Sequence, residues 1–189
     1  MSCVFSIAIP LSFGVLLLAT STALLAPDAT VSVCFAPEED CAGFVVRTID
    51  SAEREILVGA YRLTVGSGIV GALIRAKERG VDVRLIADRT APCGRASGID
   101  PLTAAAVPIW IDDEARIAHA KTMVIDSATT LMGSYNWTRG AAANSEDLNL
   151  ISSPAVAAAY AAHWRQRLAV AVQFNQRGDW CRYSSEKVR

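Results

Sequence analysis

The runs EILVGAY (residues 55–61), IVGALIRAKER (69–79) and VDVRLIAD (81–88) decide the expected fold. The first and third runs are short and apolar, as buried strands are, whereas the middle run has apolar residues at helical spacing and is followed by Gly80. A strand, a helix and a strand in this order indicate a parallel crossover unit. We therefore predict an α/β domain with a mixed, mostly parallel central sheet that is flanked by helices on both faces.

The rest of the chain extends this pattern without an internal repeat or a low-complexity linker. Apolar residues at helical spacing predict two longer helices and a shorter one, at 43–54, 154–172 and 101–106. Further strands are expected at 107–111, 117–125, 129–134 and 148–151, with loops at 36–40 and 89–97. One domain, residues 27–189, accounts for everything after the first segment.

The first 26 residues differ from the rest. From Val4 to Ala26 no residue is charged and almost all are apolar, and small residues around Ala23 suit a signal peptidase. We predict a signal peptide at 1–26 and a mature protein that is secreted or periplasmic. The amino-terminal region lacks Lys and Arg, and the apolar run approaches the roughly 20 residues that span a bilayer, so an uncleaved membrane anchor is the alternative.

Cysteine usage agrees with export. Setting aside Cys3, four cysteines remain, an even number that indicates disulfide bonds in an exported domain. Of the three possible connectivities we prefer a local Cys34–Cys41 pair, which leaves Cys93 to pair with Cys181; isolated buried thiols are the alternative. No two cysteines have the C-x-x-C spacing that structural zinc favours.

The net charge of the chain is -1. No global positive field therefore attracts a polyanion, and any anionic substrate has to be bound by a local group of positive residues.

The residues that can carry chemistry are concentrated in HAKTMVID, which starts at His119, and in GSYN, which ends at Asn136. On a strand, His119 and Lys121 project from the same face, and Ser134 and Asn136 repeat that relation at the end of the next predicted strand. A hairpin would bring an imidazole, an ammonium, a hydroxyl and an amide together. This set suits a phosphodiester, because imidazole can attack phosphorus while the other groups bind its non-bridging oxygens.

The pattern H-x-K-x4-D followed by G-S-x-N resembles the signature of the phospholipase D superfamily. The continuation NWT from Asn136 and NSE from Asn144 is similar to its small, single-motif bacterial endonucleases, and the likeness covers about residues 35–168. The resemblance implies the phospholipase D/nuclease fold and a two-step hydrolysis. One motif histidine attacks phosphorus to give a phosphohistidine, a second protonates the leaving oxygen, and water then hydrolyses the intermediate.

Carried over to this chain, the family motif makes His119 the motif histidine and Lys121 a ligand of the phosphate. Ser134 and Asn136 become hydrogen-bonding partners of the same phosphate.

Three further residues complete the expected site. The resemblance makes Asp126 a structural member of the catalytic set that holds the hairpin through backbone or Arg contacts. It makes Glu146 the carboxylate that orients His119 and fixes its tautomer. Arg139, three residues past Asn136, is the best candidate for an additional phosphate contact.

A count of histidines leads to a dimer. The mechanism needs two motif histidines, and the chain contains only His119 and His163. His163 lies in the middle of a predicted helix beside Trp164, with no Lys or G-S-x-N near it, so we expect it to serve packing or a surface hydrogen bond. The second catalytic histidine is then His119 of another copy in a two-fold homodimer, and an intramolecular His119–His163 pair is the alternative.

We expect no metal and no cofactor, because Lys121 already places a positive charge where a divalent ion would act. The leading prediction is a metal-independent phosphodiesterase, an exported endonuclease that hydrolyses DNA, with RNA as a further candidate substrate. A phospholipase D acting on phospholipid headgroups and a non-catalytic, dimeric nucleic-acid-binding module are the alternatives.

Overall fold

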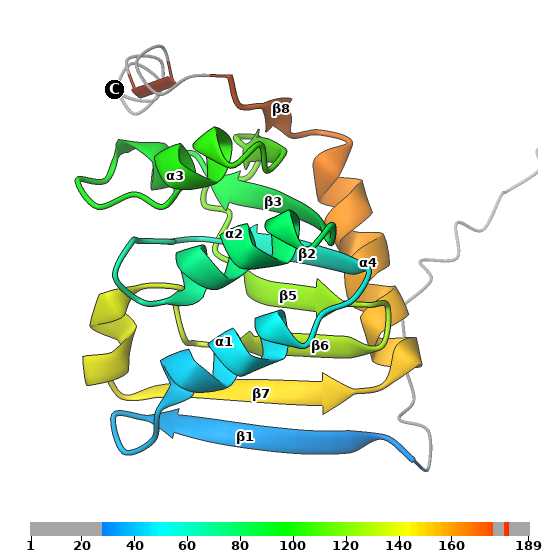
Figure 1. Ribbon diagram of the computed structural model, residues 1–189. Coiled ribbons are helices and arrows are strands. Elements are labelled where there is room, and N and C mark those ends of the chain that lie inside the picture. The colour runs from blue at the N-terminus through cyan, green and yellow to red at the C-terminus, as the bar shows by residue number, and fades with distance from the viewer. Residues whose placement is uncertain (1–27, 176–179, 182–189) are drawn as a thin grey trace, which may run out of the picture.

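A computed structural model describes residues 28–175 and 180–181, which form a single α/β domain (Figure 1). Its eight strands form one sheet in the order β1-β7-β6-β5-β2-β3-β4-β8. The strands are β1 (Thr30–Ala36), β2 (Glu55–Ala60), β3 (Asp82–Asp88), β4 (Ile109–Asp112), β5 (Lys121–Ile125), β6 (Thr129–Gly133), β7 (Glu146–Ser152) and β8 (Val172–Gln173). The helices are α1 (Cys41–Asp50), α2 (Ile69–Glu78), α3 (Ile99–Ala104) and α4 (Pro154–Leu168), with short 3-10 helices η1 (Ala91–Cys93) and η2 (Arg139–Ala143).

The α/β class and the helices on both faces are confirmed, but the sheet is mostly antiparallel and not mostly parallel. Only β2–β3 and β3–β4 pair in parallel, through the crossover helices α2 and α3. β5, β6 and β7 follow one another as antiparallel neighbours, and β1 pairs antiparallel to β7. The turn between β5 and β6 spans only residues 126–128, and so short a connection can join only antiparallel strands.

Most element positions agree with the sequence-based prediction, with two differences that matter for the site. β1 is an additional edge strand, defined by its pairing with β7 more than a hundred residues later. The strand expected at 117–125 begins only at Lys121, so His119 lies in the segment that leads into β5. The predicted signal peptide falls outside the described residues, and within those residues no helix is long and apolar enough to cross a membrane.

Two apolar clusters hold the layers together. One lies between the sheet and the helices α1, α2 and α3, and the other lies between the sheet and α4 on the opposite face. Two buried tryptophans belong to different clusters and both bind β2: Trp137 donates its indole N–H to the carbonyl of Gly59 at 3.2 Å, and Trp164 donates to that of Val58 at 2.9 Å. The centre of the sheet is therefore fixed from both faces.

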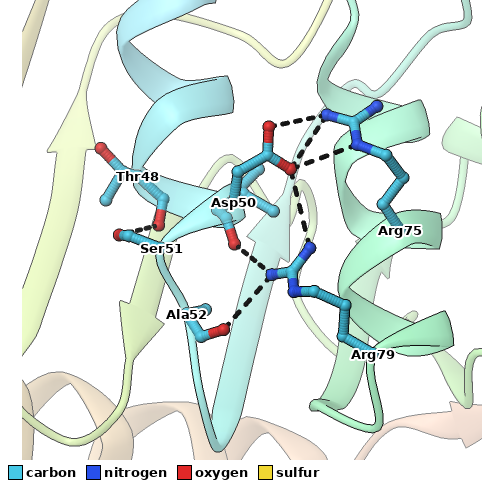
Figure 2. Close-up of polar contacts among 7 residues, drawn as sticks. Thr48, Asp50, Ser51, Ala52, Arg75 and Arg79 are labelled. Carbon is cyan, nitrogen blue, oxygen red and sulfur yellow. Dashed lines mark hydrogen bonds and ion pairs between the residues drawn. The ribbon is translucent and has the colours of Figure 1, made fainter.

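Charged contacts join α1 to α2 (Figure 2). The Asp50 carboxylate accepts hydrogen bonds from Arg75, the shortest at 2.8 Å, and forms an ion pair with Arg79 at 3.7 Å. Arg79 also donates to the carbonyls of Ile49 and Ala52 as the chain leaves α1. These arginines are thereby committed to structural carboxylate and carbonyl partners.

Two disulfide bonds match the preferred connectivity. Cys34–Cys41 ties the end of β1 to the start of α1, and Cys93–Cys181 links residues 88 positions apart. The second bond anchors the carboxyl-terminal part of the chain to the loop after β3.

Candidate active site

The extended segment before β5 presents an imidazole to solvent and an ammonium beneath it. His119 is exposed, whereas Lys121 is 6% exposed. The Lys121 Nζ lies 3.1 and 3.2 Å from the two ring nitrogens of His119 and donates to the His119 carbonyl at 2.9 Å. Nearly equal distances to both nitrogens place the ammonium out of the plane of the ring, because an in-plane position would collide with a ring carbon. Burial lowers the pKa of Lys121, and the charge of Glu146 partly opposes this.

Backbone hydrogen bonds hold this segment on both sides of His119. The amide of Ala118 donates to the carboxylate of Asp88 at 2.8 Å, and the carbonyl of Ala120 accepts from the amide of Tyr61 at 2.7 Å. Asp88 itself is 2% exposed and stands at the end of β3. The position of His119 therefore depends on residues from two other strands of the sheet.

A second polar group forms where β6 ends and β7 begins. The Ser134 hydroxyl donates to Oε2 of Glu146 at 2.5 Å and accepts from the amide of Asp147 at 3.0 Å. Asn144 donates to Oε1 of the same carboxylate at 3.0 Å. Glu146 is thus bound by Ser134 and Asn144, and in the described part of the chain no hydrogen bond joins it to His119. Its role in orienting His119 stays a prediction.

Asn136 stands between two buried aromatic residues in the sequence. Tyr135 and Trp137 are both 0% exposed, and Asn136 between them is half-buried. Its side-chain Oδ1 is buried and accepts no hydrogen bond from the described residues. Burial, followed by the charges of Asp40 and Glu146, raises the pKa of Tyr135, which indicates that this hydroxyl stays neutral.

Asp126 lies apart from these residues, at the other end of β5. Its carboxylate accepts the amides of Glu53, Arg54 and Glu55 at 2.9, 2.7 and 3.0 Å, and its carbonyl accepts from the Arg54 side chain at 2.7 Å. Burial favours a higher pKa for Asp126, but the three amides outweigh it and hold the pKa below its usual value. These are the backbone and Arg contacts expected of a residue that holds the hairpin.

Arg139 begins η2 and is exposed, with its amide 3.3 Å from the Thr64 hydroxyl. The loop after β2 and the loop after β6 therefore lie against each other. This places the backbone of Arg139 beside the loop after β2, and its role as a phosphate contact stays a prediction.

The structure adds residues that the sequence interpretation missed. The ring of Tyr61 lies 4.3 Å from the His119 ring and 4.8 Å from the Lys121 Nζ, and the guanidinium of Arg62 stacks over it at 5.1 Å. Asn144, which binds Glu146, belongs to the NSE motif, but the sequence interpretation assigned it no function. The one feature that could have identified Tyr61 is its position, because it directly follows β2, whose last residue pairs with Lys121.

A cavity of about 310 Å³ lies beside the candidate nucleophile. Both histidines line it, His119 from the segment before β5 and His163 from α4, and it also contacts the Asp112–Arg167 pair, whose two hydrogen bonds are 2.7 Å long. His163 is exposed, in agreement with a surface position on the helix. Because both histidines reach one cavity, the intramolecular alternative has to be tested.

No group of three His, Cys, Asp or Glu side chains that could hold a metal ion occurs among residues 28–175 and 180–181.

Comparison with known sequences identifies relatives over most of the chain. A family model described as cardiolipin synthase, PLD-like domain, matches residues 45–168. The chain is 36% identical over 140 residues to phospholipase D of Rickettsia conorii, which is 74% of this chain and 70% of the relative. It is 31% identical over 113 residues to mitochondrial cardiolipin hydrolase of Chlamydomonas reinhardtii, 59% of this chain and 50% of the relative.

Two solved structures share this fold over most of the chain. The crystal structure of Nuc, a phospholipase D family member from Salmonella typhimurium, superposes with a TM-score of 0.75 at 32% identity, covering 79% of this chain and all of Nuc (100%). NucT from Helicobacter pylori has the same fold, with a TM-score of 0.71 at 21% identity over 78% of this chain and 100% of NucT.

Proposed function

We propose, from the premise that this chain belongs to the phospholipase D superfamily and is a hydrolase of that superfamily, that it is an exported, metal-independent endonuclease. The observation that carries the chemistry is the exposed imidazole of His119 with the buried ammonium of Lys121 against its face. A nucleophile and a fixed positive charge in contact suit attack on a phosphodiester.

In the proposed first step a ring nitrogen of His119 forms a bond to phosphorus, and the bond from phosphorus to the leaving oxygen breaks. Lys121 neutralises the non-bridging oxygens, and Asn136 donates hydrogen bonds to them. Ser134 joins Asn136 once its hydroxyl proton turns from Glu146 to the phosphate. A second histidine donates the proton that the leaving oxygen takes. In the second step the same histidine accepts a proton from water, whose oxygen attacks phosphorus and releases His119.

We assign the second histidine to His119 of the partner subunit in a two-fold homodimer. The motif occurs once in the chain, and the exposure of His119 leaves its ring accessible to another copy. The cavity shared by His119 and His163 is the observation that favours the intramolecular alternative.

Mixing experiments separate these two arrangements. If each site needs two copies of His119, adding an equal amount of His119→Ala protein under conditions of subunit exchange should leave about half of the wild-type activity, because half of the wild-type chains then lie in mixed dimers. His163→Asn protein is the matched control and should leave the activity intact when mixed or when assayed alone. A loss in His163→Asn as deep as that in His119→Ala would reject the dimer.

Metal independence is proposed from the charge that Lys121 supplies. Its Nζ stands beside the nucleophile, where a divalent ion would otherwise neutralise the phosphate. Activity is therefore expected to persist in EDTA, and abolition by EDTA with rescue by Mg²⁺ would refute this.

Nucleic acid is the proposed substrate, with phospholipid headgroups as the alternative. The similarity over the full length of Nuc and the single motif support the nuclease, whereas the relatives named phospholipase D support the alternative. Purified protein should be incubated in EDTA with plasmid DNA, RNA and phosphatidylcholine vesicles, beside a His119→Ala control. Nicking by the wild type alone supports the nuclease; choline release without nicking supports the phospholipase; retention of DNA without turnover supports a binding module.

Export is proposed from the apolar first segment together with the two disulfide bonds. Mass spectrometry of the mature amino terminus distinguishes cleavage after about residue 26 from retention as a membrane anchor.

A further inference from the structure

Arg62 lies next to the candidate nucleophile without contacting it. Its guanidinium carbon is 5.1 Å from the centre of the Tyr61 ring, and the same ring is 4.3 Å from the His119 ring. The guanidinium is thus one aromatic ring away from the atom that would attack phosphorus. The two distances together limit how far the guanidinium can lie from the His119 ring, and a phosphate beside the one under attack falls within that range.

The charge of Arg62 is not committed to a structural partner. In the described part of the chain no carboxylate lies within ion-pair distance of Arg62, whereas the arginines of the helix–helix and strand contacts each bind an aspartate: Arg75, Arg79, Arg84 and Arg167. Lys121 also lies over the Tyr61 ring, at 4.8 Å, so two cations share one aromatic side chain. An anion bound beside that ring is attracted by both positive charges.

The backbone holds Arg62 in register with the catalytic hairpin. Its carbonyl accepts from the amide of Trp137 at 3.2 Å, and the amide of Thr64 donates back to the Trp137 carbonyl at 3.0 Å. Tyr61, the preceding residue, donates its amide to Ala120. The segment is therefore bonded both to the residues after β6, which include Asn136, and to the segment that carries His119, so the backbone of Arg62 has a fixed position relative to them.

We propose that Arg62, stacked on Tyr61, binds the phosphate adjacent to the one that His119 attacks, and that the site therefore prefers a polymeric phosphodiester to an isolated one. The inference rests on the proposed nuclease function. A guanidinium suits this role, because its planar set of donors binds phosphate oxygens in pairs while its face stacks on an aromatic ring. Phosphatidylcholine, which has one phosphate, offers no partner for this contact.

Two short substrates test the contact. A thymidine dinucleotide has one phosphodiester, whereas the trinucleotide has a second phosphate beside each bond that can be cut. We expect wild-type kcat/KM per bond to be higher for the trinucleotide, and Arg62→Ala to reduce the ratio of the two values by about tenfold, the effect of one charge-assisted phosphate contact. With longer DNA, the slope of log KM against log salt should fall by about one.

Arg165→Ala is the matched control, because Arg165 is an exposed arginine on α4 and is not one of the two cations over the Tyr61 ring. It removes the same charge and should preserve both the substrate ratio and the salt slope. Arg62→Lys keeps the charge without the planar donors and should restore the ratio only in part. Thermal unfolding of each variant guards against a loss of fold, and Arg62→Lys is the variant to interpret if Arg62→Ala is unstable.

The outcomes are distinguishable. Equal losses on both substrates in Arg62→Ala, or an unchanged ratio, would overturn the inference while leaving the nuclease intact. An equal change of the ratio in Arg165→Ala would show a general charge effect and would also overturn it. A wild-type protein that cuts neither oligonucleotide in the presence of EDTA or of Mg²⁺ would instead refute the proposed function.

Discussion

Replacing Asp126 by alanine is expected to destabilise the fold by about 2–3 kcal/mol at neutral pH while leaving the activity of the folded protein largely intact. The carboxylate accepts three backbone amides, from Glu53, Arg54 and Glu55, at 2.9, 2.7 and 3.0 Å. Each hydrogen bond to a charged acceptor contributes roughly 1 kcal/mol once the partial exposure of the group is allowed for. Because the contacts lie at the opposite end of β5 from Lys121, the candidate site should keep its geometry.

A backbone effect has to be separated from the loss of the carboxylate. Asp126 has a φ of 54°, a conformation that alanine adopts less readily than glycine or asparagine. Asp126→Gly removes the carboxylate without that strain, and Asp126→Asn keeps an oxygen acceptor but places an N–H₂ group against one of the three amides. If the hydrogen bonds carry the stability, all three variants are destabilised and Asn is the least affected.

The pH dependence gives an independent check. The folded-state pKa of Asp126 is held below its usual value, so its stabilisation is complete above the unfolded-state pKa of about 4 and is lost as pH falls through the folded-state value. The difference in unfolding free energy between wild type and Asp126→Ala should therefore shrink below about pH 4. Urea unfolding followed by tryptophan fluorescence at several pH values measures it. Equal stability of wild type and variant at pH 7, or a difference that stays constant down to pH 2, would refute the reasoning.

Three further predictions follow from contacts in the same structure. The double replacement of Cys93 and Cys181 by serine should lower the unfolding free energy by about 3–5 kcal/mol, because the bond closes a long loop, and an unchanged melting temperature under non-reducing conditions would contradict this. Gly133→Ala should reduce both stability and activity, since a Cβ there would collide with the backbone of β7 beside the site, whereas Gly140→Ala, with open space around it, is the control that should behave as wild type. Tyr61→Leu should lower kcat more than it raises KM and should alter the pH–rate profile, because the ring contacts both His119 and Lys121. Retention of most activity by Tyr61→Phe would support this, whereas an equal loss in both variants would argue against a role for the ring.

The local pattern of apolar residues was sufficient to predict the buried strands and amphipathic helices. The runs that became β2, α2 and β3 have the periodicity of a buried strand or an amphipathic helix, and the structure places them within a residue or two of the prediction. The direction of strand pairing could not be obtained in this way. The short 126–128 connection predicts an antiparallel hairpin of β5 and β6, but an apolar run such as β5 has the same sequence character whether it pairs with β2 in parallel or antiparallel.

The candidate site was likewise predictable only in part. His119, Lys121, Ser134 and Asn136 were identifiable because their chemistry and spacing lie within two short runs of sequence. Glu146 was identifiable as a carboxylate, but its binding to Ser134 depends on the register of β6 against β7.

By itself, the sequence determined the residue types that can attack and bind a phosphodiester, the half-cystines that pair and most of the helices and strands. Only the tertiary structure decided that Tyr61 and Arg62 lie near His119 and that Asp126 binds the backbone amides of residues 53–55. The physical reason is that spacing along one strand or helix is set by local backbone geometry, whereas proximity between strands is set by which backbone hydrogen bonds form across the whole sheet, and those depend on residues far apart in the chain.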